Sequence, residues 1–232
     1  MKKLLFSPIF VLLLISASFA PSHAQGVPAD SLFVAYKQDS ANNCASIALI
    51  KANLNAFGLN GIYKERIIDN NTREYLLRDS SKILLTNAEL QLAREKFNAD
   101  ISPATTPYLK SIVDVSLICY AIMAKKFPHE FPVLAAPTFE ENLAYISDVS
   151  FNVKYGTNLL GTGEYFFIPR GRYSGIRGKI GAIVWSPGHT VFANNRKCDM
   201  PGSSANFYKF TKSYLRFWGR MWIDPREPKS KP

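Results

Sequence analysis

The sequence predicts an α+β fold in which a helical N-terminal lobe packs against a C-terminal lobe of antiparallel strands. Capping boxes and apolar residues at helical spacing are concentrated before Phe151. After Phe151, short apolar runs are separated by turns that contain glycine or proline, which is typical of strands. Because helices come first and strands later, the two kinds of element are expected to segregate.

The first 24 residues are expected to be a secretory signal peptide. The positive start at Lys2-Lys3 precedes an apolar run over residues 4–19, and Ser22-His23-Ala24 has the small residues of a cleavage site. The run is too short, and has the wrong flanks, for a membrane span. We therefore expect a secreted or periplasmic protein with no integral membrane span after cleavage.

The remaining chain has the size of one domain. Removal of the signal peptide leaves about 208 of the 232 residues, which we assign to a domain over residues 25–224 and a disordered tail over residues 225–232. The net charge then falls from +10 to +8, because two lysines are lost. A surplus of this size favours solubility, and no nucleic-acid-binding motif accompanies it. No nucleic-acid partner is expected.

Three cysteines in an exported chain leave at least one thiol unpaired within it. Cys119 lies in an apolar helical run and is expected in the core. Cys198 lies in a polar loop and is either free or paired. The chain is large enough to build an apolar core without a disulfide scaffold.

Five helical segments are expected in the first part of the chain. Their ends are marked by Asn42-Asn43, by glycines at positions 58 and 61, and by the capping boxes Thr86-Asn87-Ala88-Glu89 and Thr138-Phe139-Glu140-Glu141. Residues 31–36 are expected to be extended or to form a turn, and residues 127–137, with three prolines, cannot lie inside a helix. The expected helices span residues 44–57, 62–68, 86–97, 108–126 and 138–147.

Five strands are expected in the second part. Ser186-Pro187-Gly188 forms a turn between two of them. Such short connections require antiparallel neighbours, because parallel strands need a long crossover. The expected strands span residues 164–168, 180–186, 189–194, 207–211 and 215–223.

Cys44, His189 and Gln38 are the residues whose placement points to a chemistry. Cys44 begins the predicted buried helix, where unpaired amides and the positive end of the dipole favour a thiolate. His189 begins a predicted strand, and an imidazole beside a thiol acts as its base. Gln38 precedes Cys44 by six positions, so its amide is placed to donate to an oxyanion together with the Cys44 N–H. Each residue also has an ordinary structural explanation, as a buried cysteine, a hydrogen-bonded histidine or an exposed glutamine.

This pattern resembles the papain-like cysteine peptidases. Residues 38–49 look most like the calpain motif of glutamine, Gly-Asp-Cys and an apolar helix, and Gly188-His189-Thr190-Val191 is similar to the calpain segment Gly-His-Ala-Tyr. The resemblance implies that Cys44 is the nucleophile, His189 the general base and Gln38 the oxyanion donor, in a cleft between a helical lobe and a sheet lobe. The chain departs from the motif at Asn42-Asn43, where the family has Gly-Asp, and at Ala45, where an aromatic residue is usual.

A residue that orients His189 is also expected, because a catalytic base needs a group that fixes its tautomer. The Asn-x-Trp-Gly string of calpains and papain is missing from the sequence. Trp222-Ile223-Asp224-Pro225 looks more like the aspartate-proline ending of bacteriocin-processing peptidases of the same clan, which implies Asp224. An ordinary strand-ending turn explains Asp224 equally well. The alternatives are Asn194, Asn195 and Asp199.

The sequence therefore predicts a secreted thiol hydrolase that cleaves a peptide or isopeptide bond of a peptide or protein substrate through an acyl-enzyme. A transglutaminase or amidase of the same clan, and a catalytically inactive binding module on the same fold, are the alternatives. The reaction needs no cofactor. No metal site is expected, because His129-Glu130 is not followed by a second histidine at helical spacing. The substrate and the oligomeric state stay open.

Overall fold

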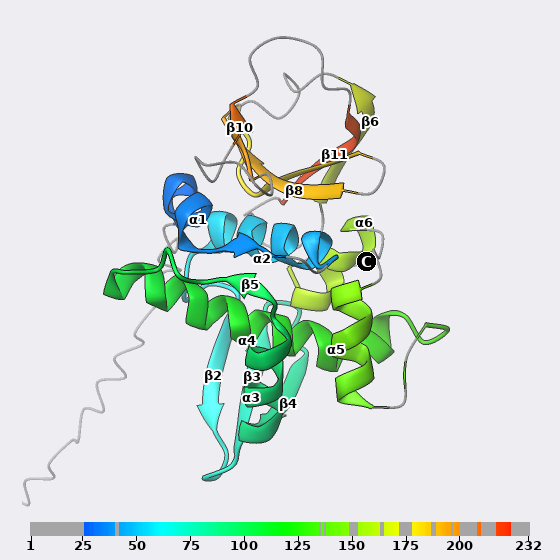
Figure 1. The fold of residues 1–232 in the computed structure, drawn as a ribbon. Helices are drawn as coiled ribbons and strands as arrows, with labels where there is room; N and C mark the ends of the chain where they lie inside the picture. Colours follow the sequence, from blue (N-terminus) through cyan, green and yellow to red (C-terminus); the bar gives the residue numbers. More distant parts are fainter. Residues whose placement is uncertain are drawn as a thin grey trace, which may run out of the picture.

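The chain forms an α+β fold with a three-stranded and a six-stranded antiparallel sheet and a pair of short strands (Figure 1). The structure is a computed structural model that describes residues 26–39, 42–134, 136, 138–148, 153–162, 165–171, 178–186, 189–195, 197–199, 208–209 and 217–223. The predicted signal peptide, the predicted tail and Asp224 lie outside these residues. The helices are α1 (Ala29–Ala35), α2 (Cys44–Phe57), α3 (Asn87–Lys96), α4 (Pro107–Glu130), α5 (Phe139–Asp148), α6 (Val153–Gly156) and the 3-10 helix η1 (Thr157–Leu160). The strands are β1 (Lys37–Gln38), β2 (Tyr63–Ile67), β3 (Thr72–Leu77), β4 (Lys82–Thr86), β5 (Ala99–Asp100), β6 (Tyr165–Gly171), β7 (Ala182–Ser186), β8 (His189–Asn194), β9 (Lys197–Cys198), β10 (Tyr208–Lys209) and β11 (Phe217–Ile223).

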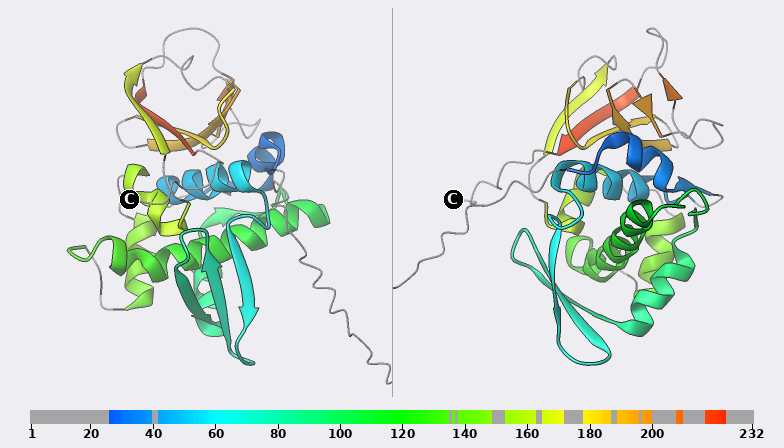
Figure 2. Two further views of the ribbon diagram at one scale, coloured as in Figure 1. Left: turned by 180° about the vertical axis from the view of Figure 1, so that it is seen from behind. Right: turned by 90° about the vertical axis from the view of Figure 1, so that its left-hand side faces the viewer.

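Helix α2 lies between the six-stranded sheet and most of the other helices (Figures 1 and 2). All 14 of its residues are buried, which agrees with its largely apolar sequence. Strand β8 packs along it on one side, and α4 contacts it on the other. The helix ends before Gly58, which adopts a φ of +75° that favours glycine. Both ends of the predicted helix over residues 44–57 are therefore confirmed.

The six-stranded sheet has the order β10–β9–β8–β7–β11–β6 and two distinct faces. Alternation along the strands separates these faces. The face that joins the main core beside α2 carries Ile183, Phe192, Met221 and Ile223. The opposite face is lined by Ala182, Val184, Val191, Ala193 and Cys198. Figure 1 shows the sheet curling so that its edge strands β6 and β10 face each other, and we call this second face the concave face.

The helical half also contains a three-stranded sheet, so the helix predicted over residues 62–68 is wrong. Residues Tyr63–Ile67 form strand β2, which pairs with β3, and β3 pairs with β4. Asp69 forms the turn between β2 and β3, because its Oδ1 accepts hydrogen bonds from the backbone N–H groups of Asn71 and Thr72. Tyr63 packs edge-on against Tyr75 of β3. This hairpin pairing, extended by β4, overrides the local helical spacing.

Two further expectations are corrected. Residues Ala29–Ala35 form helix α1 where an extended or turn segment was expected, and α1 buries Leu32 and Phe33 in the core. Helix α4 continues to Glu130 and includes Pro128. Pro128 removes one backbone N–H donor from the helix, and the helix ends two residues later, at Glu130.

The other predicted helices and strands are present, whereas β1, β3, β4, β5, β9, α6 and η1 were not predicted. The capping box of α3 forms between Thr86 and Glu89, and α5 begins at Phe139. Strand β8 has the bounds that were predicted, and the four other predicted strands are present with ends shifted by up to three residues. Helix α4 is long and apolar enough to span a membrane, but 56% of its most apolar window is buried inside the protein.

All three cysteines are free and buried. Cys119 lies in the core of α4, as expected. Cys198 lies in β9 on the concave face, and not in a polar loop. Burial raises the pKa of both thiols well above the usual range.

Candidate functional site

Cys44 is the first residue of α2 and keeps only 4% of its surface exposed. Asn43 occupies the N-cap position but does not cap the helix with its side chain. Its amide nitrogen donates instead to the carbonyl oxygen of Phe97, at 2.6 Å, and so ties the start of α2 to the end of α3. The expectation that this asparagine caps the helix is therefore wrong. The Asn43 side chain therefore does not occupy the first-turn amides of α2, which are the kind of group that binds an anion.

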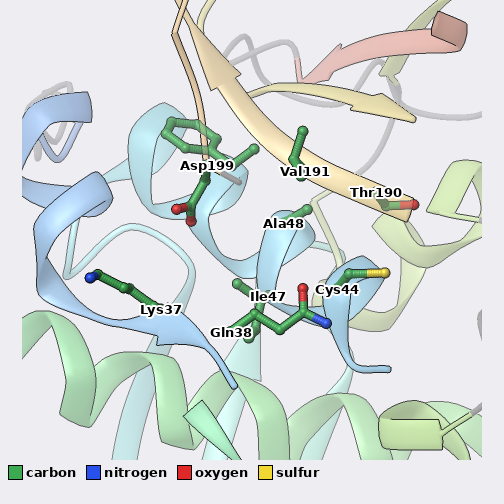
Figure 3. Close-up of a pocket in the computed structure, with 9 residues that line it drawn as sticks. Lys37, Gln38, Cys44, Ile47, Ala48, Thr190, Val191 and Asp199 are labelled. Carbon is green, nitrogen blue, oxygen red and sulfur yellow. The ribbon is translucent and has the colours of Figure 1, made fainter. Parts of the chain in front are cut away.

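Gln38 and Cys44 line the same pocket (Figure 3). Gln38 is held by β1, where it pairs with Ala99 of β5. In Figure 3 its amide points toward the first turn of α2. The pocket has a volume of about 10 Å³, which is room for about one water molecule. The residues that line it are Lys37, Gln38, Cys44, Ile47, Ala48, Thr190, Val191, Phe192 and Asp199.

His189 lies at the end of β8 that meets the start of α2. Thr190, the next residue, lines the pocket with Cys44. At the other end of β8, the Asn194 amide lies 3.4 Å from Asn55 Oδ1, near the end of α2. Strand and helix therefore run side by side with their first residues at the same end.

The imidazole itself does not line the pocket, and no hydrogen bond joins it to Cys44 among the described residues. Alternation places His189 on the concave face with Val191, while Thr190 faces α2. The side chain is half-buried, and this burial lowers the pKa of His189 below its usual value. Its Nε2 atom has no hydrogen-bond partner within the described part of the chain.

Each of the three described candidates for orienting His189 makes another contact or lies in a turn. Asn194 lies beside Asn55, Asn195 is exposed in a turn with a φ of +42°, and the Asp199 carboxylate binds Lys51. Asp224 lies outside the described residues. Its neighbour Trp222 is level with Ala182 and hence with Ala193, at the end of the sheet away from His189. None of the described candidates is hydrogen-bonded to His189.

A buried ion pair beside the pocket was not predicted. Lys51, in the middle of α2, is fully buried and binds both Asp199 and the Tyr36 carbonyl oxygen, the latter at 2.8 Å. Its ammonium also lies 4.4 Å from the centre of the Tyr36 ring. Burial lowers the pKa of Lys51, and Asp199 opposes that shift. The sequence signal for this pair was a lysine inside a largely apolar helix, because a buried lysine requires a partner.

Comparison with protein-family models, curated proteins and solved structures finds no match for this chain. The described residues contain no group of three or more metal-ligating side chains. The chemistry must therefore be argued from the pocket, which combines a thiol and a carboxamide at the first turn of a helix.

Proposed function

We propose that the protein is a secreted or periplasmic thiol hydrolase with a papain-like arrangement, acting on a peptide or isopeptide bond. The observation that carries the proposal is that Gln38 and Cys44 share one pocket at the start of α2, beside the end of β8 where His189 lies. A nucleophile at a helix start, a carboxamide beside it and an imidazole on the adjacent strand are the parts that acyl transfer needs.

In the proposed reaction, the Cys44 sulfur attacks the carbonyl carbon while His189 accepts the thiol proton. Gln38 and the Cys44 backbone N–H donate to the oxyanion. Collapse of the intermediate breaks the C–N bond, and His189 returns the proton to the leaving amine. Water then hydrolyses the thioester and regenerates the thiol, with His189 again as the base.

The reaction requires the pocket to open and the imidazole to move around the end of β8, because alternation places His189 on the face of the sheet opposite to Cys44. Cys44 is 4% exposed, and the pocket admits about one water molecule, so a substrate carbonyl cannot reach the thiol in this conformation. Catalytic contacts are commonly loose in an enzyme without its substrate. The proposed mechanism therefore requires the closed pocket to open, and Cys44 and Gln38 already line that pocket.

The test is covalent labelling with an epoxysuccinyl peptide, read by mass spectrometry. Labelling is expected at Cys44 alone, because burial raises the pKa of Cys119 and Cys198 and suppresses their thiolates. Cys44→Ala should abolish labelling, and Cys119→Ala is the matched control that should leave it intact. His189→Ala should slow it by roughly 100-fold or more, the usual range for loss of a positioned base. Labelling that ignores both Cys44→Ala and His189→Ala contradicts the proposal.

The second candidate is a catalytically inactive binding module on the same fold. It is favoured by the closed pocket and by the missing hydrogen bond between Cys44 and His189 in the described structure. A binding module leaves Cys44 unlabelled in the native protein and labelled only after unfolding. If Cys44 reacts, product analysis with an added amine then separates hydrolysis from transfer to an acceptor.

A further inference from the structure

The Lys51 ammonium contacts both sides of the pocket. On the β8 side it binds the Asp199 carboxylate, and Asp199 lines the pocket. On the Gln38 side it donates to the Tyr36 carbonyl oxygen at 2.8 Å, and Tyr36 directly precedes β1. One buried group of α2 therefore joins the strand that carries Gln38 to the opposite side of the pocket.

Cys44 and Lys51 project from the same stripe of α2. They are seven residues apart, which is about two turns of an α-helix and about 10 Å along its axis. Ile47 and Ala48 lie between them at helical spacing, and both line the pocket. The thiol and the ammonium therefore stand at the two ends of one stripe of a fully buried helix.

Tyr36 is the fixed end of the segment that carries Gln38. Its side chain is fully buried, its ring centre lies 5.4 Å from that of Phe97, and the Lys51 ammonium lies 4.4 Å from the same ring centre. Gln38 follows two residues later in an extended strand, which is at most about 7 Å along the chain. That strand pairs with only two residues of β5. The position of Tyr36 therefore sets where the Gln38 amide can stand, and Figure 3 shows that amide directed toward the first turn of α2.

We propose that Lys51 is a positioning residue of the site, which holds the Gln38 amide in place for the oxyanion through its bond to Tyr36. The inference rests on the proposed function, in which Gln38 donates to that oxyanion. A buried ion pair is often no more stabilising than apolar side chains of the same volume, so the core alone does not require a lysine here. An apolar side chain could not bind Asp199 and the Tyr36 carbonyl oxygen at once. A donor that is already in place lowers the barrier to acyl transfer, and a misplacement of about 1 Å can cost about 100-fold in rate.

The test compares two reactions of the Cys44 thiol in the folded protein. Acetylation by p-nitrophenyl acetate joins the sulfur to the carbonyl carbon, passes through an oxyanion and releases p-nitrophenol. Alkylation by iodoacetamide displaces iodide and forms no oxyanion. Both reactions need the pocket to open and the thiol to lose its proton, so the ratio of their rates isolates the contribution of the oxyanion donors. Rates measured with Cys44→Ala are subtracted, which removes the reactions of other groups.

Two variants remove the Lys51 ammonium without leaving an unpaired charge. The first is Lys51→Met/Asp199→Ala, and Lys51→Met/Asp199→Asn takes its place if the first does not fold, as judged by circular dichroism. The matched control is Lys126→Met/Asp79→Ala. Lys126 is also a buried lysine that binds an aspartate and a backbone carbonyl oxygen, that of Asn158 at 2.6 Å, but neither of these partners lines the pocket.

Loss of the ammonium should act only when Gln38 is present. Gln38→Ala should lower the ratio of acetylation to alkylation by about 100-fold, the usual loss for one oxyanion donor. Lys51→Met/Asp199→Ala should lower the ratio by about tenfold or more, and by nothing further when Gln38→Ala is already present. The control variant should leave the ratio unchanged.

The results that overturn the inference separate it from the proposed function. Equal losses with and without Gln38→Ala mean that Lys51 does not act through Gln38, and they overturn the inference. So does an unchanged ratio in Lys51→Met/Asp199→Ala, or an equal loss in the control, while Gln38→Ala still lowers the ratio; the proposed function then stands. If Gln38→Ala leaves the ratio unchanged, or if the folded protein does not react at Cys44, the proposed function fails and this inference fails with it.

Discussion

Removal of the Asp199 carboxylate is expected to destabilise the protein more than most single substitutions. In Asp199→Ala, the Lys51 ammonium stays fully buried with only the Tyr36 carbonyl oxygen and ring as partners. Breaking a buried ion pair on one side costs about 3–5 kcal/mol. Loss of the proton from Lys51 limits this cost, because neutralising a lysine at pH 7 requires about 5 kcal/mol.

Urea denaturation followed by circular dichroism measures the free energy of unfolding of four proteins. These are the parent, Asp199→Ala, Lys51→Met and the double variant. The double variant should recover most of the loss, because a methionine fills the volume of Lys51 without a charge. The cost of Asp199→Ala should also shrink as the pH rises from 7 toward 10. Burial lowers the pKa of Lys51 in the folded state while Asp199 raises it, so removing Asp199 lowers this pKa further and makes the stability of the variant rise more steeply with pH than that of the parent.

A cost below about 1 kcal/mol for Asp199→Ala would refute the argument, because an uncompensated buried charge cannot be that mild. A double variant no more stable than Asp199→Ala would refute it as well. That result would mean that Asp199 acts through its own packing and not through the Lys51 charge.

Three further outcomes are expected. Gly219→Ala places a methyl group 2.1 Å from the Trp185 ring and should lower the free energy of unfolding in urea denaturation by about 1–3 kcal/mol. Trp185→Leu should relieve most of that cost. If the costs of the two substitutions simply add in the double variant, the clash is not the cause. Because burial lowers the pKa of His189 below 6.5, the unfolded chain binds a proton that the folded chain resists, so stability should fall as the pH drops below 6.5. His189→Gln should flatten that slope, and an unchanged slope contradicts it. Thr86→Ala removes the capping contact with Glu89 and should cost about 1 kcal/mol, with thermal melting as the measurement; an unchanged midpoint contradicts it.

The sequence was a good guide wherever a local signal decided the structure. Glycine at position 58 and the capping box at Thr86 located helix ends to within a residue. It failed where pairing or packing with another element decided the structure. Strand β2 exists because it pairs with β3, and α1 forms because Leu32 and Phe33 find a core to enter. The helical spacing of one segment, taken alone, shows neither a strand partner nor a core.

The candidate site shows the same division. The sequence placed Cys44 at a helix start and His189 at a strand start, and both positions are confirmed. Periodicity indicated that β8 is buried, but not which of its faces meets α2, because that depends on register. The Lys51–Asp199 pair joins residues 148 positions apart, so spacing alone cannot reveal it.

The β8 side and the Gln38 side of the pocket are fixed by different contacts, and this difference indicates which side opens. The β8 side of the pocket is tied to the middle of α2, where Asp199 binds Lys51, and near the end of α2, where Asn55 Oδ1 accepts from the Gly181 N–H at 2.8 Å. The Gln38 wall is a two-residue strand paired with only two residues of β5. A segment with so few backbone partners opens at a lower free energy than a strand inside a six-stranded sheet. We therefore expect access to Cys44 to come by displacement of the Gln38 side; in the proposed reaction, the carboxamide would then return to the oxyanion when that side closes over a bound substrate.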